Sequence, residues 1–296
     1  MERVALVTDS VATVPPDLAR ELGILVVPLS VEIDGVVYRD GVNLAPEDLY
    51  HRMASALLLP RTSQPAPGAW LAAFEAAAAA GADRILCFTI SSRFTGTFAS
   101  AVLAAGIFGE EAPPGTRPRV DVVDTRLAAI AEGWVVIEAA RAARRGASAE
   151  QVLARAHDVA CRARLVAAVD TLEYLMRGGR VPRLAGLAAS AIKVKPMAQL
   201  RDGEAVAAGA ARSMQTAYRA MVRRMARECR EVKRKTGRPA CLRVGVMHAG
   251  APERARELAE LIRTRLDPAK LLVTDFTPVM GVHTGPGVVG VGYFAE

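Results

Sequence analysis

The sequence predicts an α/β fold divided into two α/β domains. Through the first half of the chain, short β-branched runs alternate with helical stretches rich in alanine and leucine, which is the pattern of a largely parallel sheet. The 296 residues, 51% of them hydrophobic, can bury a large core, and this length favours two modest domains. Gly146 and Ser148 mark a helix end and a new helix start, so we expect domains over residues 1–147 and 148–296.

The first domain begins with an apolar run at residues 4–7, which predicts a strand that ends in polar Thr8-Asp9-Ser10. Pro15-Pro16 opens a helix and Gly23 closes it, because proline fits a first helical turn and glycine a C-terminal one. The remaining elements follow in order: a hairpin of residues 24–33 and 36–38 around Asp34-Gly35, a helix from Pro46, a loop at 61–68, a helix to about residue 80, a strand at 84–89, a helix from about residue 97, a strand at 120–123 and a helix to residue 145.

The second domain is expected to begin with a helix at Ser148, because serine is a favoured N-cap. Its Asp202-Gly203 pair predicts a hairpin turn, and the glycines and proline of residues 282–287 predict an irregular loop. The other elements are a strand at 165–169, a short helix capped by Asp170-Thr171, hairpin strands at 197–200 and 204–208, a long basic helix over 219–235, a strand at 242–247, a helix from Pro252, a strand at 271–276 and a closing strand at 288–294.

Composition disfavours several classes of protein. No apolar run approaches the roughly 20 residues of a membrane span, and the closest, at residues 71–82, contains Glu75. The first residues lack a secretory signal pattern, so we expect a cytoplasmic protein without a transmembrane segment. The four cysteines lie far apart without a CxxC pair, and no histidine has zinc-ligand spacing, which predicts reduced thiols and no metal site.

The net charge of +7 comes from an excess of arginine that is densest between Arg219 and Lys235. Such an excess is compatible with nucleic acid, an anionic lipid surface or an acidic partner. Only Tyr218 offers a ring for base stacking near this run, so a solvated helix face is favoured over a nucleic-acid site. We therefore expect no nucleic-acid partner, and transient contact with a membrane surface stays open.

Hydroxyl-rich loops follow several of the predicted strands. Because the carboxyl ends of parallel strands converge on one crevice, these loops are expected to meet there. The loop at residues 91–97 opens a helix, whose free N–H groups and positive dipole end suit a carboxylate or a phosphate. An N-cap is the simpler interpretation of any single hydroxyl, but four such loops together weaken it. The loops are Thr8-Asp9-Ser10, Thr62-Ser63-Gln64, Ser91-Ser92-Arg93-Phe94-Thr95-Gly96-Thr97 and Asp124-Thr125.

Signatures of catalysis are sparse. His283 precedes a glycine-rich segment that lets the backbone approach a ligand, so it is either an anion donor or a surface turn residue. Gly178-Gly179-Arg180 could cradle a phosphate, but no GxxxxGK[ST], GxGxxG or GxSxG motif is present. Asp9, Asp124 and Asp170 resemble helix caps. An enzyme that uses Asp9, Asp124 or His283 as acid–base groups on a phosphorylated or acyl substrate is the alternative to a binding protein.

Five segments of the chain form a specific combination. They are Thr8-Asp9-Ser10 with Val27-Pro28-Leu29 and Tyr38-Arg39-Asp40-Gly41, then Thr62-Ser63-Gln64-Pro65, Ile90 to Thr97, Asp170-Thr171-Leu172-Glu173-Tyr174-Leu175 with Gly178-Gly179-Arg180, and His283-Thr284-Gly285-Pro286-Gly287. Through these segments the chain resembles the DegV family of fatty-acid-binding proteins along essentially its whole length. It departs from the family pattern at Thr95 and Ala66, which are usually serine.

The resemblance implies a two-domain α/β protein that holds one long-chain fatty acid, such as palmitate, in a tunnel between its domains. The carboxylate would be bound by Thr62, Thr95 and His283. Threonine at position 95 keeps the hydroxyl and adds a methyl group that could shift the head-group geometry. The supporting residues of the same loops would be Ser63, Ser92, Gly96, Thr97 and Thr284.

The resemblance also implies a carrier without catalysis of its own. Some members of the family carry the fatty acid to a separate ATP-binding kinase subunit, so the expected partners are a fatty acid and a fatty acid kinase subunit. No cofactor is expected, because the fatty acid is the ligand. Arg180 and Arg212 are candidates for docking an acidic partner at the mouth of the site, against the alternative that they are ordinary solvated arginines.

Overall fold

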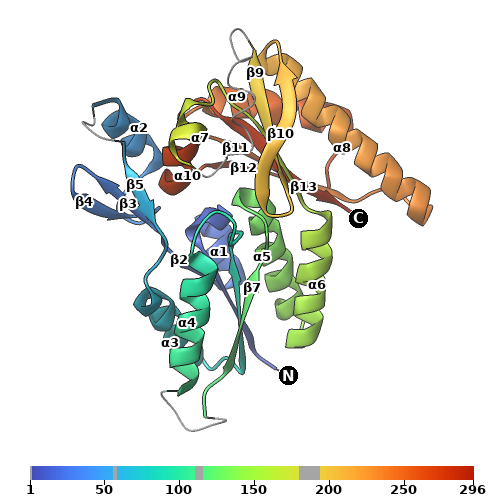
Figure 1. Cartoon of the computed structure of the whole chain (residues 1–296). Helices are drawn as coiled ribbons and strands as arrows, with labels where there is room; N and C mark the ends of the chain where they lie inside the picture. The colour runs from blue at the N-terminus through green and yellow to red at the C-terminus, as the bar shows by residue number, and fades with distance from the viewer. Residues whose placement is uncertain (1, 56–58, 111–115, 180–193) are drawn as a thin grey trace.

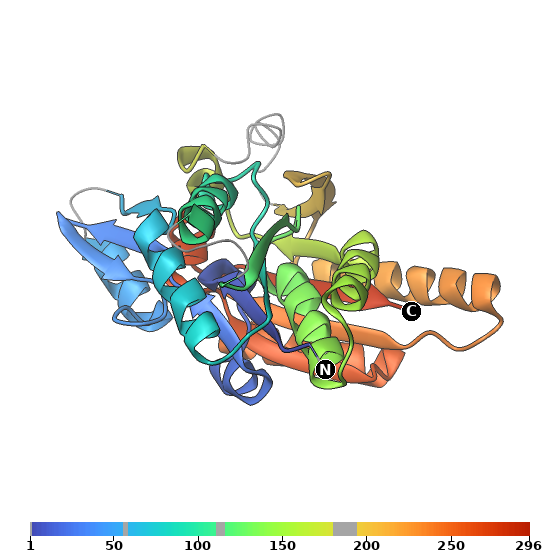
Figure 2. The ribbon, with the colours of Figure 1, turned by 90° about the horizontal axis from the view of Figure 1, so that it is seen from below.

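The computed structural model describes residues 2–55, 59–110, 116–179 and 194–296. Figure 1 shows a parallel sheet from the first half of the chain in the lower part of the molecule and a second sheet from the other half in the upper part. Helices accompany both sheets, as Figure 2 shows from below. The predicted α/β fold class is therefore confirmed.

The first sheet is parallel and buried on both faces. Leu86 and Phe88 share one apolar cluster with α5, whereas Ile85 and Cys87 share another with α3 and α4. This two-sided burial explains why its strands are continuous apolar runs. The strand order is β2 (Ile24–Val27), β1 (Val4–Asp9), β6 (Arg84–Thr89) and β7 (Arg119–Asp124). The helices around it are α1 (Pro16–Leu22), α3 (Pro67–Ala79), α4 (Thr97–Glu110) and α5 (Ala129–Arg144).

The structure divides one predicted strand into two. Residues 24–33 form β2 and, after Pro28, β3 (Ser30–Ile33), because proline has no N–H to continue a ladder. β3 pairs with β4 (Val36–Arg39) across the predicted Asp34-Gly35 turn, where φ is 48° and 80°. On its other side β3 pairs with β5 (Arg61–Ser63), a strand that sequence reasoning assigned to a loop. Helix α2 (Pro46–Ser55) starts at the predicted proline.

The second sheet has six strands in the described residues, and β11 with β12 is its only parallel pair of neighbours. The predicted Asp202-Gly203 hairpin joins β9 to β10. Helices α8 (Met214–Thr236) and α9 (Pro252–Leu266) pack against one face through a shared apolar cluster. The strand order is β10 (Glu204–Ala211), β9 (Lys195–Arg201), β8 (Arg164–Ala168), β13 (Val289–Ala295), β11 (Leu242–His248) and β12 (Lys270–Asp275).

Two local predictions in the second half are wrong. The expected loop at residues 282–287 begins with helix α10 (Pro278–Thr284), so His283 lies in a helical last turn. Of the predicted Asp170-Thr171 cap of the short helix α7 (Glu173–Arg177), only Thr171 takes part: its Oγ1 accepts a hydrogen bond from the N–H of Glu173 at 3.1 Å, whereas Asp170 does not cap the helix. Its carboxylate instead accepts hydrogen bonds from Lys195 Nζ at 2.7 Å and Arg254 Nη1 at 2.6 Å. This half-buried carboxylate therefore links the end of β8 to the start of β9 and to α9.

Helix α5 joins the two halves of the molecule. It packs against β1 in the first sheet and against β8, β11 and β13 in the second. Trp134 Nε1 on α5 donates to the carbonyl oxygen of Gly292 at 3.0 Å. Helix α6 (Ala149–Arg162) follows with the predicted Ser148 cap, completed by Gln151 as a capping box. One apolar cluster runs through both halves from Leu6 to Phe294, and the domain boundary at residues 147 and 148 remains a prediction.

Helix α8 has a net charge that nearly equals that of the whole chain. It contains eight basic and two acidic residues, so it holds a net charge of +6 out of +7 for the chain. Figure 1 shows it extending outward along the upper sheet. No helix in the described ranges combines the length and apolar character needed to span a membrane. Among the same residues, no group of three His, Cys, Asp or Glu side chains is placed so that it could bind a metal ion.

Candidate functional site

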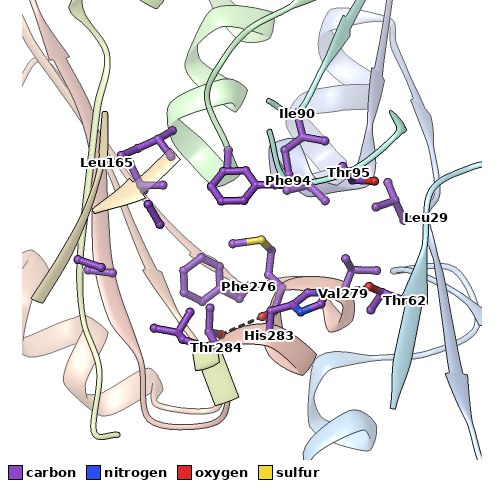
Figure 3. Close-up of a pocket in the computed structure, with 18 of the residues that line it drawn as sticks. Leu29, Thr62, Ile90, Phe94, Thr95, Leu165, Phe276, Val279, His283 and Thr284 are labelled. Atoms are coloured by element: carbon purple, nitrogen blue, oxygen red, sulfur yellow. Dashed lines mark hydrogen bonds between the residues drawn. The ribbon is translucent and has the colours of Figure 1, made fainter. Parts of the chain in front are cut away.

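A cavity of about 240 Å³ lies between the two halves of the molecule. The carboxyl end of the parallel sheet forms one wall through Val11 and Ile90. The second sheet forms the opposite wall through Leu165 and Ala198, and α10 closes a third side with Val279. This is where loops leaving parallel strands were expected to converge. Figure 3 shows the cavity with labelled side chains from both halves around it.

Thr62 and His283 form a polar pair at one side of this cavity. Thr62 lies on β5 and His283 in the last turn of α10, and Thr62 Oγ1 is 2.7 Å from His283 Nε2. The pairing of Thr62 with Val31 of β3 fixes the position of that hydroxyl. Gly178 leaves room for the imidazole, because a methyl group there would lie 2.7 Å from His283 Nδ1. In Figure 3 the imidazole points towards Thr62.

Thr95 supplies a third polar group at the start of α4. Its Oγ1 lies 3.2 Å from Thr97 Oγ1, and Thr97 is the first residue of that helix. The first N–H groups of a helix lack partners inside the helix, so the segment from Thr95 to Thr97 is suited to an anion. Gly96 keeps the loop close to Gln64, because a methyl group at Gly96 would lie 3.3 Å from Gln64 Nε2.

The rest of the cavity wall is apolar. Figure 3 shows Phe94 and Phe276 extending into the cavity from opposite sides, with Leu165 beside them. No lysine or arginine lies among the described residues that line it. Its aliphatic and aromatic lining residues include Val11, Leu29, Ile90, Val169, Leu175, Leu200, Met280 and Val288. The site is therefore amphiphilic, with polar groups at one side and a large apolar surface elsewhere.

Asp40 fixes α10 against the first half of the chain. Its carboxylate accepts a hydrogen bond from the backbone N–H of Val279 at 2.9 Å, and another from Ser10 Oγ at 2.6 Å. Ser10 Oγ in turn accepts one from the N–H of Leu29 at 3.1 Å. Burial raises the pKa of the Asp40 carboxyl, and the Ser10 and Val279 hydrogen bonds lower it. The helix that carries His283 is thus held at its N-terminal end from across the cavity.

The acidic residues of the enzyme alternative do not reach the cavity. Asp9 is buried and accepts hydrogen bonds from the N–H groups of Val11 at 2.9 Å and Ile90 at 2.8 Å, which confirms its predicted capping role. Burial raises the pKa of Asp9 to about 7. Asp124 accepts from Ser92 Oγ at 2.6 Å and from the N–H of Arg126 at 2.9 Å. Neither aspartate is among the lining residues.

The structure brings together six of the predicted site residues and leaves three others of the described ones outside the cavity. Those that line the cavity are Thr62, Ser63, Thr95, Gly96, His283 and Thr284. Ser92 does not, because its side chain bonds Asp124 instead, and Thr97 is buried behind Thr95. Arg212 is exposed and lines no part of the cavity, and Arg180 lies outside the described residues.

Sequence reasoning missed most of the apolar lining. Phe94 stands inside a polar loop, and this isolated aromatic residue was the one signal that could have been used. Gln64 was named only as part of its loop, and Phe276 only as the end of a strand. An apolar wall is assembled from residues far apart in the chain, so it leaves no local motif.

Comparison with known proteins gives a consistent result. The family model described as "Uncharacterised protein, DegV family" matches residues 3–296. A DegV domain-containing protein of Caldanaerobacter subterraneus is 31% identical over 297 residues, covering 100% of both chains.

Two solved structures are similar over nearly the whole chain. One is described as showing fatty acid binding of a DegV family protein from Thermus thermophilus, with a TM-score of 0.86, 32% identity and coverage of 99% of this chain and 100% of that one. The other, a stearic acid-binding protein from Eubacterium ventriosum, has a TM-score of 0.86, 26% identity and coverage of 99% and 98%. The matched range, the identity and the shared fold together establish that this chain belongs to the DegV family.

Proposed function

We propose that this protein binds one long-chain fatty acid in the cavity between its halves. The carboxylate is held by the hydroxyls of Thr62 and Thr95 and by the imidazole of His283, and the alkyl chain lies among the apolar walls. The observation that carries this proposal is the amphiphilic cavity itself, with the Thr62–His283 pair 2.7 Å apart at one side and apolar side chains elsewhere. The fatty acids named for the Thermus and Eubacterium proteins support the same ligand class.

The energetics suit such a ligand. An ionised carboxylate loses its hydration on burial, and hydrogen bonds from hydroxyls and an imidazole offset that loss. Each buried methylene contributes about 0.8 kcal/mol, so a long alkyl chain contributes on the order of 10 kcal/mol before ordering costs. The polar groups therefore determine which end enters where, and the apolar lining supplies most of the affinity.

We further propose a carrier role, in which the protein uses no cofactor, works in the cytoplasm and presents the head group to a partner such as an ATP-binding fatty acid kinase subunit. The proposed docking residue among the described ones is Arg212, which is exposed before α8. Reversing its charge, Arg212→Glu, should weaken transfer to the kinase subunit and leave lipid occupancy intact. Loss of both properties, or of neither, would contradict this division of roles.

Native mass spectrometry of gently purified protein tests the binding proposal. We expect a mass increment of one fatty acid, which extraction and gas chromatography would then identify. His283→Ala and Thr62→Ala should lower occupancy, whereas Ser92→Ala should not, because Ser92 bonds Asp124 outside the cavity. A wild-type protein that carries no lipid and ignores added palmitate and oleate would refute the proposal.

A further inference from the structure

A second cleft, of about 950 Å³, lies on the other side of the β9–β10 hairpin from the proposed fatty-acid cavity. Its walls come from the loop after β7, from α6, from the tip of the hairpin and from α8. Gln199 and Leu200 of β9 line both spaces, so a single strand separates them. Figure 1 shows the hairpin of β9 and β10 reaching down towards the first half of the chain.

Three arginines face this cleft without a protein partner. Arg126, Arg201 and Arg227 come from three different elements, and in the described part of the chain their side chains make no hydrogen bond or ion pair. Arg126 has a left-handed φ of 55°, stabilised by the hydrogen bond from its N–H to Asp124. Two further arginines in the lining are engaged: Arg164 with the carbonyl of Cys161, and Arg224 with Gln199.

Two of the three acidic side chains that line the cleft are already paired with other residues. Asp124 already binds Ser92 and the backbone of residue 126. Glu228 accepts a hydrogen bond from Tyr293 Oη at 2.9 Å and lies 3.9 Å from Arg164 Nε. Asp202, in the hairpin turn, is the exception, because its carboxylate makes no hydrogen bond or ion pair with the described residues. The unpaired guanidinium groups therefore leave an excess of positive charge around the cleft.

The floor of the cleft is aliphatic. It includes Val135, Leu153, Ala156 and Ala160. Among the described lining residues there is no Phe, Tyr or Trp, and the one ring, that of His157, contacts Cys161 Sγ at 3.5 Å. An aliphatic floor favours an alkyl chain over a nucleobase, which would be expected to stack on an aromatic ring. Guanidinium groups that line one cleft from separate elements favour a phosphate, since arginine forks match its oxygens. The inner cavity, by contrast, has hydroxyls and an imidazole and no arginine.

We propose that this cleft is a second lipid site, which binds an amphiphile with a phosphate head group and an aliphatic chain. Arg126, Arg201 and Arg227 bind the phosphate, and the aliphatic floor receives the chain. The proposal rests on the chemistry of the cleft and does not require the inner ligand to be a fatty acid.

Isothermal titration calorimetry with octyl phosphate tests the proposal on protein saturated with palmitate. Inorganic phosphate and octanoate serve as separate arms, because they carry only one half of the proposed ligand. We expect octyl phosphate to bind at least tenfold more tightly than either, and to bind less tightly as the salt concentration rises. The double variant Arg201→Ala/Arg227→Ala should lose at least tenfold in affinity. The matched control is Arg223→Ala, an exposed arginine of α8 that does not line the cleft.

Several outcomes would overturn the proposal. These are failure of octyl phosphate to bind the wild-type protein, equal binding to the double variant, and displacement of palmitate; the last result would place octyl phosphate in the inner cavity. Equal affinity for inorganic phosphate would exclude a role for the aliphatic floor, and equal affinity for octanoate would exclude phosphate selection. Native mass spectra report palmitate occupancy separately, and a Thr62→Ala protein should still bind octyl phosphate, so failure of the inner site is distinguishable from failure of the cleft.

Discussion

Thr95 is the residue at which the proposed head-group site departs from its family pattern. Its hydroxyl lies at the start of α4, and its extra methyl group occupies space that serine would leave open. We expect Thr95→Ser to bind fatty acid as well as the wild type. Thr95→Ala should weaken binding about tenfold, because one charge-assisted hydrogen bond contributes roughly 1.5 kcal/mol. Displacement of a fluorescent fatty acid measures both, and a large loss in Thr95→Ser would show that the methyl group is needed.

Thr62→Ala should weaken binding more than Thr95→Ala does. The Thr62 hydroxyl contacts His283 Nε2 as well as facing the cavity, so its removal disturbs two of the three proposed carboxylate partners. The same displacement assay gives the comparison. The double variant Thr62→Ala/Thr95→Ala should lose less binding free energy than the sum of the two single losses, since residues in one network are not independent. Fully additive effects would argue that the three groups do not act on one carboxylate.

Glu132, which does not line the cavity, should make the free energy of unfolding depend on pH. It is fully buried on α5, neither of its carboxylate oxygens has a hydrogen-bond partner among the described residues, and burial raises its pKa well above the usual value of 4.5. The unfolded chain therefore releases this proton at lower pH than the folded one. The contribution of Glu132 to the free energy of unfolding should therefore be largest below pH 4.5 and should fall as pH rises above 4.5.

Glu132→Gln isolates this effect, because the amide imitates the neutral carboxyl group. Its unfolding free energy in urea should exceed that of the wild type at pH 8, and the difference should shrink as pH falls towards 5. Exposed Glu75→Gln is the control and should follow the wild-type profile. A variant with the same pH slope as the wild type would show that Glu132 titrates normally.

At the scale of elements, α10 shows why local signals can mislead. Its glycine and the following Gly285-Pro286-Gly287 indicated a loop, yet these residues have separate roles. Gly281 allows close packing, because a methyl group there would lie 2.7 Å from both Leu49 Cδ2 and Tyr50 Oη of α2. Gly285 ends the helix at φ 72°. Neither the contact with α2 nor the capping by Asp40 can be inferred from adjacent residues.

Other elements were predictable because their signals are local. Proline and glycine mark both ends of α1, and Ser148 with Gln151 marks the start of α6. Pro28 is also a local signal, but the strand predicted over residues 24–33 was not divided at it. The short strand β5 was not predictable, because it depends on β3 lying alongside. The candidate site divides in the same way. Thr62, Thr95 and His283 were found through motifs, whereas the wall that includes Phe276 is formed only by tertiary packing.

Asp40→Ala should loosen α10 and thereby the proposed site. The change leaves the N–H of Val279 and the hydroxyl of Ser10 buried without their acceptor, which costs roughly 2–5 kcal/mol of stability. Hydrogen exchange should accelerate at residues 279–284, and fatty-acid affinity should fall although Asp40 lines no part of the cavity. Asp17→Ala, which removes an exposed partner of Arg20, is the control. Unchanged exchange in α10 would contradict the positioning role.

At the scale of the whole molecule, α5 makes the two halves interdependent. Ile130 of α5 packs against Gly245 and Gly292 of the second sheet, where no side chain could fit. Leu86 and Phe88 of the first sheet belong to the same apolar cluster as Phe294 of the second. Because this cluster cannot be divided without exposing α5, the halves should unfold together even if each resembles a domain. Far-UV circular dichroism and the fluorescence of Trp70 and Trp134 should therefore give one coincident transition.

Gly292→Ala is the sharpest test of this coupling. The added methyl group would lie 2.6 Å from Ile130 Cγ2 and 2.7 Å from the backbone nitrogen of Ala131, so α5 must move away from the second sheet. Overpacking of this kind destabilises by roughly 1–3 kcal/mol, and the helix that must move is packed against both sheets. The urea midpoint should fall equally for both probes. Gly106→Ala in α4, where no atom lies within 4 Å of the new methyl group, should leave stability unchanged or raise it by about 0.5 kcal/mol. Two separated transitions in Gly292→Ala, with the Trp70 environment unaffected, would instead show that the first sheet is stable without the second.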